Sequence, residues 1–477
     1  MKTNTLDFDA QALRERILDL AMRGKLVPQE PNDEPASVLL EKIKAEKAEL
    51  VKEKKIKKTK ALPAITDDEK PFDIPDSWEW VRLGDVTDVV MGQAPKGSNV
   101  NDQGEGIEFH QGKTEFTETV IGKSSKYTTD SNKIVDSNFI IMAVRAPVGD
   151  VNLLDRKISI GRGLAGIAPY ISNKIYIFYY LESIKNYFER RSTGSTFKAI
   201  NGNTIKNAVV PLPPLSEQSR IAAKIAQLFA LLRKVESSTQ QYAELQTLLK
   251  TKVLDLAMRG KLVKQDPNDE PASVLVEKIK AEKAELVKKK KIKKSKPLPP
   301  ITDEEKPFDI PDSWEWVRIS DVLDVRDGTH DTPKYVADGI PLITSKNISN
   351  GKLDFTNINF ISKDDFEKIN ERSKVDKGDI IFAMIGTIGN PVLVDTDTKF
   401  GIKNVALLKH FTDKLNMDFI LDYLLVLQVI WNSNATGAVQ KFVSLRKIRK
   451  SVLPLPPFKE QKKIVRKIDQ IFRMIGE

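Results

Sequence analysis

The side chains in this sequence whose types and clustering could do chemistry are mostly amides and cations. Gln, Asn, Arg and Lys can pair with base edges or hold phosphates, and here they gather in glycine-rich, loop-like stretches such as MGQAPKG and STFKAINGN. For any one of them, loop hydrogen bonding or surface hydration is an equally good explanation, so the clustering carries the prediction. The predicted DNA-binding residues are Gln93, Lys96, Gln111, Lys113, Arg145, Arg162, Lys198, Asn201 and Asn203 in the first half, and His330, Lys334, Lys346, Asn347, Lys403, Asn404, Lys441 and Arg446 in the second.

Motifs of catalysis are missing from the sequence. Gly122-Lys123-Ser124 lacks the upstream glycine of a phosphate-binding loop. His330 has no serine or carboxylate at the sequence spacing of a known catalytic motif. The PLPP segments differ from the Asn- or Asp-Pro-Pro-aromatic box of amino-methyltransferases. With no cysteine and three histidines, a thiolate zinc site is impossible and a histidine-rich metal site is not expected. We therefore predict a chain that is not an enzyme by itself and holds no metal.

Length and charge narrow the class of protein. A chain of 477 residues with 40% apolar content has room for about three domains with real cores. A formal charge of +10 favours a polyanionic partner. No apolar N-terminal run resembles a signal peptide, and nowhere do about 18 apolar residues follow one another as a membrane span needs. We expect a cytoplasmic protein.

A long internal repeat organises the chain. Residues 17 to 82 return as residues 253 to 318, at a constant offset of 236 and with nine mismatches. Each copy contains a helix end, a charged helix with a lysine-rich tail, and an acidic, proline-broken connector that ends in PDSWEWVR. Two readings of the lysine tail stay open: a solvated helix end that grades into a flexible linker, or a contact with the DNA backbone.

Each copy of the repeat leads into a region with mixed α/β patterning. Strands are predicted in NFIIMAVRA and GRGLAGIAP of the first region, and in GIPLITSK, DIIFAMIGTIGNPVLV and NVALLKHF of the second. One helix is predicted in each, IYIFYYLESIKNYFERR and MDFILDYLLVLQVIW. Weak alignment of FIIMAVRAPVGD with IIFAMIGTIGN, and of GIEFHQGK with GIPLITSK, indicates that the two regions share a fold.

A heptad pattern predicts a long helical spine. After PLPPLSEQ, apolar residues keep steps of four and three through a helix from about 215 to 258, which would be ~65 Å long. Both chain ends carry the same rhythm, so we infer two antiparallel helices, one continuous and one assembled from the termini. In the alternative, the terminal helices pack only on their own domains. The predicted seam comprises Leu13, Ile17, Leu20, Ile221, Ile225, Leu228, Leu232, Val235, Leu249, Val253, Leu256, Ile464, Ile468, Ile471 and Ile475.

Together these parts resemble the specificity subunit of type I restriction–modification systems, over nearly the whole chain. The resemblance rests on PDSWEWVRLGDV and PDSWEWVRISDV, on PLPPxxEQ followed by a long helix, on VRAPVGDVN with GRGLAGI, on DGTHDTPKY with GIPLITSKNISNGKLDF, and on LDLAMRGKLV with EKIKAEKAEL. Many members place the second helix and its tail at the C-terminus, whereas here these pieces lie at the N-terminus, so the order is circularly permuted. Two other hypotheses stay open: a self-sufficient DNA methyltransferase or nuclease, and a coiled-coil adaptor that binds only proteins.

The resemblance implies a fold class and a set of partners. The fold is expected to be α+β, with two mixed α/β target recognition domains separated by a long antiparallel two-helix coiled-coil spine, pseudo-twofold and circularly arranged. Each domain would read one half of an interrupted double-stranded DNA site, and the spine would bind two methyltransferase subunits, which two restriction/translocase subunits could join. No cofactor is expected on this chain; S-adenosylmethionine belongs on the methyltransferase, and ATP and magnesium on the endonuclease. The predicted domain ranges are 1–74, 75–213, 214–310, 311–456 and 457–477.

Overall fold

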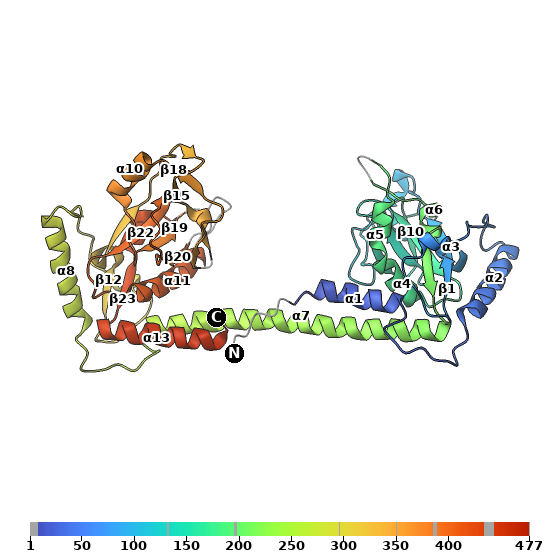
Figure 1. The fold of residues 1–477 in the computed structure, drawn as a ribbon, viewed down its shortest axis with the longest axis horizontal. Helices are drawn as coiled ribbons and strands as arrows, with labels where there is room; N and C mark the ends of the chain where they lie inside the picture. The colour runs from blue at the N-terminus through green and yellow to red at the C-terminus, as the bar shows by residue number, and fades with distance from the viewer. Residues whose placement is uncertain are drawn as a thin grey trace. The chain divides into compact units, whose positions relative to one another are not determined.

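The computed structural model describes residues 8–130, 133–194, 198–294, 296–349, 351–384, 389–433 and 443–476. These divide into two compact units, the first ending at Thr239 and the second beginning at Gln240. The boundary falls inside one long helix, α7, which runs from Leu215 to Met258 (Figure 1). Each unit contains one copy of the repeat and one recognition domain.

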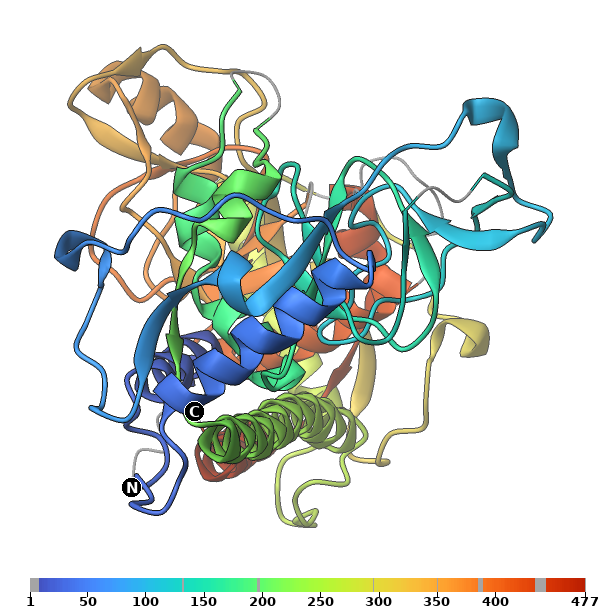
Figure 2. The same cartoon turned by 90° about the vertical axis from the view of Figure 1, so that its right-hand side faces the viewer.

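The first unit holds the N-terminal helices and the first recognition domain. Its elements are α1 (Ala10–Met22), α2 (Ala36–Lys52), β1 (Glu79–Arg82), α3 (Leu83–Val86), β2 (Thr87–Met91), β3 (Val100–Asn101), β4 (Ile107–His110), β5 (Tyr127–Thr128), β6 (Ile134–Val135), β7 (Ile140–Ala143), β8 (Val151–Leu153), β9 (Ile158–Ile160), β10 (Leu164–Pro169), α4 (Lys174–Ser183), α5 (Lys185–Arg190), α6 (Gly202–Lys206) and β11 (Val209–Leu212). In both views the strands of this domain lie to one side of α7 (Figures 1 and 2).

The second unit repeats this order. Its elements are α8 (Ala272–Lys288), β12 (Glu315–Arg318), α9 (Ile319–Val322), β13 (Leu323–Asp327), β14 (Tyr335–Val336), β15 (Ile340–Ile343), β16 (Ile348–Ser349), β17 (Lys352–Leu353), β18 (Asn359–Ile361), α10 (Lys363–Ser373), β19 (Ile380–Ala383), β20 (Gly389–Leu393), β21 (Gly401–Ile402), β22 (Val405–His410), α11 (Met417–Ser433), α12 (Leu445–Lys450), β23 (Val452–Leu455) and α13 (Phe458–Ile475).

The two recognition domains share one four-stranded sheet and one two-stranded ribbon and differ in the size of a further sheet. A four-stranded antiparallel sheet has the order β2-β10-β7-β8 in the first domain and β13-β22-β19-β20 in the second. A second sheet contains one parallel pair in each domain, β4 with β9 and β15 with β21. A two-stranded ribbon, β1-β11 or β12-β23, joins the domain's first and last strands. The predicted α+β class, with two mixed domains of shared fold, is confirmed.

The repeat forms the same helix end in both units, and glycine is required there. Gly24 has φ +66° after α1, and a Cβ at this position would lie 2.5 Å from Pro75 Cγ. Gly260 has the same φ after α7, and a Cβ there would lie 2.4 Å from Pro311 Cγ. A left-handed turn and a close approach therefore both exclude a side chain.

A buried tryptophan joins the connector of each repeat to the helix that leaves the domain. Trp78 Nε1 donates to Glu217 Oε2 at 2.9 Å, and Trp314 Nε1 donates to Glu460 Oε2 at 3.1 Å. Both glutamates are almost fully buried, and burial raises the pKa of each. The PLPPxxEQ segment therefore holds the start of α7 or α13 against its own domain.

Within each unit a terminal helix packs antiparallel against part of α7. Arg14 of α1 pairs with Glu236 at 2.9 Å in the first unit. In the second unit the main-chain oxygen of Ile475 in α13 accepts from Tyr242, and Lys250 lies over the Phe472 ring at 5.5 Å. Each terminal helix therefore packs both on α7 and on its own domain. The first seven residues and residue 477 lie outside the described residues.

Burial along the predicted seam varies with position. Ile221, Ile225, Val253, Ile464, Ile468 and Ile475 are buried; Ile17, Leu20, Leu228, Leu232, Leu256 and Ile471 are half-buried; Leu13, Val235 and Leu249 are exposed. In α1 the buried residues are Ala10, Leu18, Ala21 and Met22, and the first unit's core includes the last three. The same core contains Ile221 and Ile225 of α7, and Ile17 of the predicted seam packs against it.

Candidate nucleic-acid interface

Three loops of the first recognition domain meet through main-chain hydrogen bonds. The loop after β2 donates from Gly92 to Leu164 at 2.9 Å and from Gln93 to Ile160 at 3.0 Å. The loop after β9 donates from Gly163 to the oxygen of Gln111 at 3.1 Å. Glycine permits this contact, because a Cβ at Gly92 would lie 2.1 Å from Gly161 O. The parallel pairing of β4 with β9 thus places Gln93, Gln111 and Arg162 on loops that touch.

A fourth loop joins the same edge of the domain. Val144 donates to Gly163 O and Ala146 donates to Lys198 O, each at 2.9 Å. These bonds place Arg145 and Lys198 beside the loop that carries Arg162. We define the first reading cluster as Gln93, Gln111, Arg145, Arg162 and Lys198, and all five side chains are exposed. Amide and cationic donors in this number can pair with base edges and phosphates.

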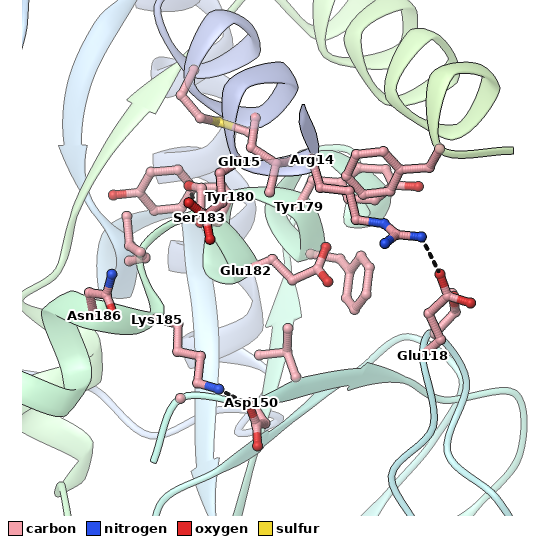
Figure 3. Close-up of a pocket in the computed structure, with 18 of the residues that line it drawn as sticks. Arg14, Glu15, Glu118, Asp150, Tyr179, Tyr180, Glu182, Ser183, Lys185 and Asn186 are labelled. Atoms are coloured by element: carbon pink, nitrogen blue, oxygen red, sulfur yellow. Dashed lines mark hydrogen bonds and ion pairs between the residues drawn. The ribbon is translucent and has the colours of Figure 1, made fainter. Parts of the chain in front are cut away.

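The other predicted residues of this domain take different positions. Lys96 and Asn203 are exposed, and Asn201 caps α6 by accepting from Thr204 N at 3.0 Å. Lys113 pairs with Asp150, which also pairs with Lys185. Lys113, Asp150 and Lys185 line a cleft of about 1400 Å³ between the recognition domain and the helices α1 and α7 (Figure 3). Lys113 therefore lines this cleft and is paired with Asp150.

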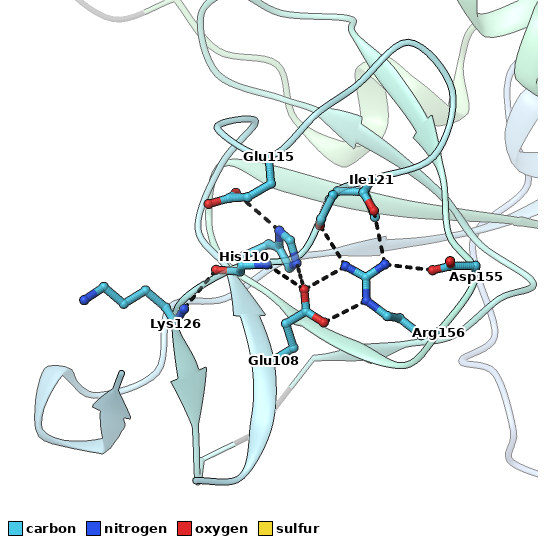
Figure 4. A network of polar contacts seen from close by, with 9 residues as sticks. Glu108, His110, Glu115, Ile121, Lys126, Asp155 and Arg156 are labelled. Carbon is cyan, nitrogen blue, oxygen red and sulfur yellow. Dashed lines mark hydrogen bonds and ion pairs between the residues drawn. The ribbon is translucent and has the colours of Figure 1, made fainter. Parts of the chain in front are cut away.

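A buried polar network lies behind the loop that carries Gln111 (Figure 4). Arg156 donates two hydrogen bonds of 2.7 Å to Glu108, and the fully buried His110 lies 2.8 Å from Glu108 and 3.3 Å from Glu115. Burial opposes ionisation of Glu108, yet hydrogen bonds from Arg156 and Ser124 lower its pKa to about 2. Sequence reasoning missed this network, for which the charged residues within GIEFH were the only signal. In the second domain the equivalent of His110 is the apolar Ile343.

The second recognition domain builds the same junction with other side chains. Gly328 donates to Val405 O at 2.9 Å, Thr329 donates to Ile402 O at 3.0 Å, and Lys403 donates to Ile343 O at 2.9 Å. These bonds place His330, Lys403 and Asn404 together, and we define them as the second reading cluster.

His330 has acceptors at both ring nitrogens. Its Nδ1 lies 3.1 Å from Asn404 Oδ1, and its Nε2 lies 2.7 Å from Asp327 Oδ2. The hydrogen bonds to Asn404 and Asp327 and the charge of Asp327 raise the pKa of His330. The ring is 61% exposed and lies beside Asn404, whose φ is +56°.

The remaining predicted residues of the second domain are dispersed. Lys334 and Lys346 are exposed, and Arg446 is exposed on α12. Asn347 is buried and donates to the oxygens of Asp354 and Asn357, so its amide holds a loop. Lys441 lies outside the described residues.

In the part of the chain that the structure describes, no three or more His, Cys, Asp or Glu side chains are arranged to hold a metal ion. Over the same residues, no helix has the length and apolar character needed to cross a membrane.

Comparison with known proteins identifies relatives over most of the chain. The family model of the type I restriction modification DNA specificity domain matches residues 75–247 and 311–476. The EcoAI specificity subunit of Escherichia coli is 33% identical, over 98% of this chain and 89% of its own. The EcoEI specificity subunit of Escherichia coli is 37% identical, over 66% of this chain and 62% of its own. The crystal structure of the HsdS subunit from Thermoanaerobacter tengcongensis has a TM-score of 0.50 and 19% identity, over 85% and 92% of the two chains, which is a likeness of fold.

Proposed function

This chain belongs to the type I restriction–modification DNA specificity family, and from that premise we propose that each recognition domain reads one half of a bipartite, interrupted DNA site. DNA recognition is the role of the family. The division of the site into two halves is our inference from the two recognition domains. The observation that carries it is the junction of loops that gathers amide, cationic and imidazole side chains in each domain.

The two reading clusters differ in chemistry although their loops are joined by equivalent main-chain bonds. The first contains two glutamines, two arginines and a lysine, and the second contains His330, Lys403 and Asn404. Arginine favours guanine, whereas glutamine and asparagine favour adenine. Two such clusters on one scaffold support recognition of two different half-sequences.

Exposed apolar side chains on α7 support docking of the methyltransferase subunits. Leu231, Leu245 and Leu248 are 53%, 63% and 65% exposed. Rows of exposed leucine on a helix are typical of a surface that a partner covers. Because the repeat gives each unit the same helix end, charged helix and connector, it supplies two equivalent places for one kind of partner. The proposed stoichiometry is two methyltransferase and two restriction/translocase subunits.

Chemistry in the complex is assigned to the partners. The chain lacks sequence motifs for binding S-adenosylmethionine or nucleotide phosphates. In this proposal the methyltransferase binds S-adenosylmethionine and flips an adenine in each half-site. ATP and magnesium belong to the endonuclease. The chain itself acts as a non-catalytic reader.

Domain exchange tests the division of labour. Residues 83 to 207 are replaced by the matching segment of another family member, and the complex with its methyltransferase is used to methylate DNA. Mapping of methylated adenines should show one changed half-sequence, while the other half-sequence and the gap remain. A change in both halves would contradict the proposal, because each domain would then not act separately.

A further inference from the structure

Each unit carries an exposed lysine-rich segment at the end of the charged helix. Residues 52 to 60 contain six lysines and one glutamate, and residues 288 to 296 contain seven lysines. All thirteen lysines are exposed. We call these segments the first and second lysine straps. Residue 295 lies outside the described residues.

The first lysine strap is anchored at both ends. On its N-terminal side, Leu39 and Ile43 of α2 are buried in the core of the first unit, and Lys47 Nζ donates to Gly84 O at 2.7 Å. On its C-terminal side, Arg82 donates to the oxygens of Pro63 and Ala64, each at 3.1 Å. The strap is therefore a short loop held against the recognition domain.

The second lysine strap has the same anchors. Lys283 donates to Ser320 O at 2.6 Å, and Arg318 donates to Pro299 O at 3.2 Å and to Pro300 O at 3.3 Å. Arg318 also pairs with Glu305, as Arg82 does with Glu69. The mismatch at position 53 replaces the one glutamate of the first strap by Lys289. Both units thus hold the same cationic loop in the same way.

Helix termination explains only part of this charge. α2 ends at Lys52, and Lys54 takes the left-handed conformation with φ +59°. Cations in the last turn stabilise a helix through its dipole, an effect that falls off within that turn. Lys57, Lys58 and Lys60 lie beyond that turn, so helix stability does not account for them.

The first strap lies on the side of the domain that carries α6. A Cβ at Gly84 would lie 2.8 Å from Lys206 Cβ and 3.1 Å from Leu62 Cδ1, so α6 and the connector meet on α3. α6 follows directly from the chain segment that donates from Ile200 to Val144 O beside the first reading cluster. The strap, α3, α6 and the cluster therefore follow one another across the domain.

From this placement we propose that each lysine strap binds phosphates of the DNA that flanks its half-site. The inference rests on the proposed function, since it assumes that the reading clusters contact the half-sites. Anchored lysines supply sequence-independent contacts that fix the domain on the duplex, while the clusters select the bases. The straps thereby extend the contacted DNA beyond the bases that are read.

Paired lysine substitutions test the proposal in the complex with the methyltransferase. The strap variant is K57Q/K58Q, and its counterpart in the second unit is K293Q/K294Q. The matched control is K42Q/K44Q, which removes two exposed charges from α2 outside the strap. Each strap variant should reduce the slope of log affinity against log salt by about 1.8, since each phosphate contact contributes about 0.9. The loss of DNA affinity caused by a strap variant, relative to the control variant, should therefore be roughly tenfold larger at 50 mM salt than at 200 mM salt.

Flanking DNA supplies the second readout. A duplex with ten additional base pairs on each side should bind the unchanged complex more tightly than one cut at the half-sites, and strap variants should lose this difference. Strap variants with the salt slope and flank dependence of the control would overturn the proposal. So would dissociation of the methyltransferase from strap variants without DNA, which would assign the lysines to an acidic partner surface. Failure of the unchanged complex to prefer its target sequence would instead overturn the proposed function.

Discussion

Removal of one heptad from α7 tests whether the helix sets the gap between the half-sites. Residues 237 to 243 form the stretch to delete, which lies between Glu236, a contact of α1, and Gln246, a contact of α13. The deletion also removes the hydrogen bond from Tyr242 to the main-chain oxygen of Ile475. Seven residues keep the four-three rhythm, so Val235 is followed by Gln246 and Leu249 in the same seam. Residues 2 to 8 are removed as well, so that the N-terminal segment opposite α7 loses the same number of residues. The N-cap residue Asp9 of α1 stays in place.

The expected change in the gap follows from helix geometry. Seven residues correspond to about 10.5 Å of rise, which equals about three base pairs at 3.4 Å each. The helix face turns by only about 20° per heptad, whereas three base pairs turn by roughly 105° at a repeat of about 10.3 pairs. The DNA or the spine must absorb this difference, so we expect a gap that is two or three base pairs shorter, and slower methylation.

The assay uses a DNA library in which the gap between two fixed half-sequences varies. The complex with the methyltransferase is incubated with the library, and methylated adenines are mapped. The control variant, S237A/S238A, changes side chains within the same stretch without shortening it, and it should retain the original gap. Methylation by the deletion variant at the original gap would refute the idea that α7 measures the spacing.

Two further predictions concern single residues. The raised pKa of His330 means that the protonated ring and its hydrogen bonds persist above the ordinary value of about 6.5. The contribution of the protonated ring to DNA affinity is therefore complete below that pH and is lost as pH rises through the raised pKa, so binding titrations should show DNA affinity falling in that range. H330Q should remove this pH dependence, and an unchanged profile in H330Q would contradict the prediction. Ile464→Ala should lower the free energy of unfolding by about 2–5 kcal/mol because Ile464 is fully buried. L248A, at an exposed site, should change the free energy of unfolding by less than about 0.5 kcal/mol but weaken methyltransferase binding in sedimentation. Equal losses of stability in the two variants would contradict the assignment of Ile464 to the core and of Leu248 to a partner surface.

Local patterns in the sequence predicted most elements because their period is a local property. Steps of four and three along residues 221 to 256 predicted α7, and the repeat predicted that both units contain the same helix end, charged helix and connector. Apolar runs predicted β7 and β10 of the first four-stranded sheet and β19, β20 and β22 of the second; in β7 and β19 the buried residues follow one another directly in the chain.

The same patterns could not identify which face of α1 is buried in the core. Periodicity selected Leu13, Ile17 and Leu20; of these Ile17 packs against the core, whereas the residues of α1 within it are Leu18, Ala21 and Met22. A helix that packs against both α7 and a recognition domain has two apolar faces, and a sequence period does not say which surface each face meets.

By itself the sequence determined the repeat, the helical spine and a supply of amide and cationic side chains in loops. Only the tertiary structure decided which of these side chains meet, because the junctions depend on pairing between β4 and β9, and between β15 and β21, which are distant in the chain. It brought Gln93, Gln111 and Arg162 onto touching loops and directed Lys113 toward Asp150. The spacing of residues within one segment does not identify which distant strand that segment pairs with.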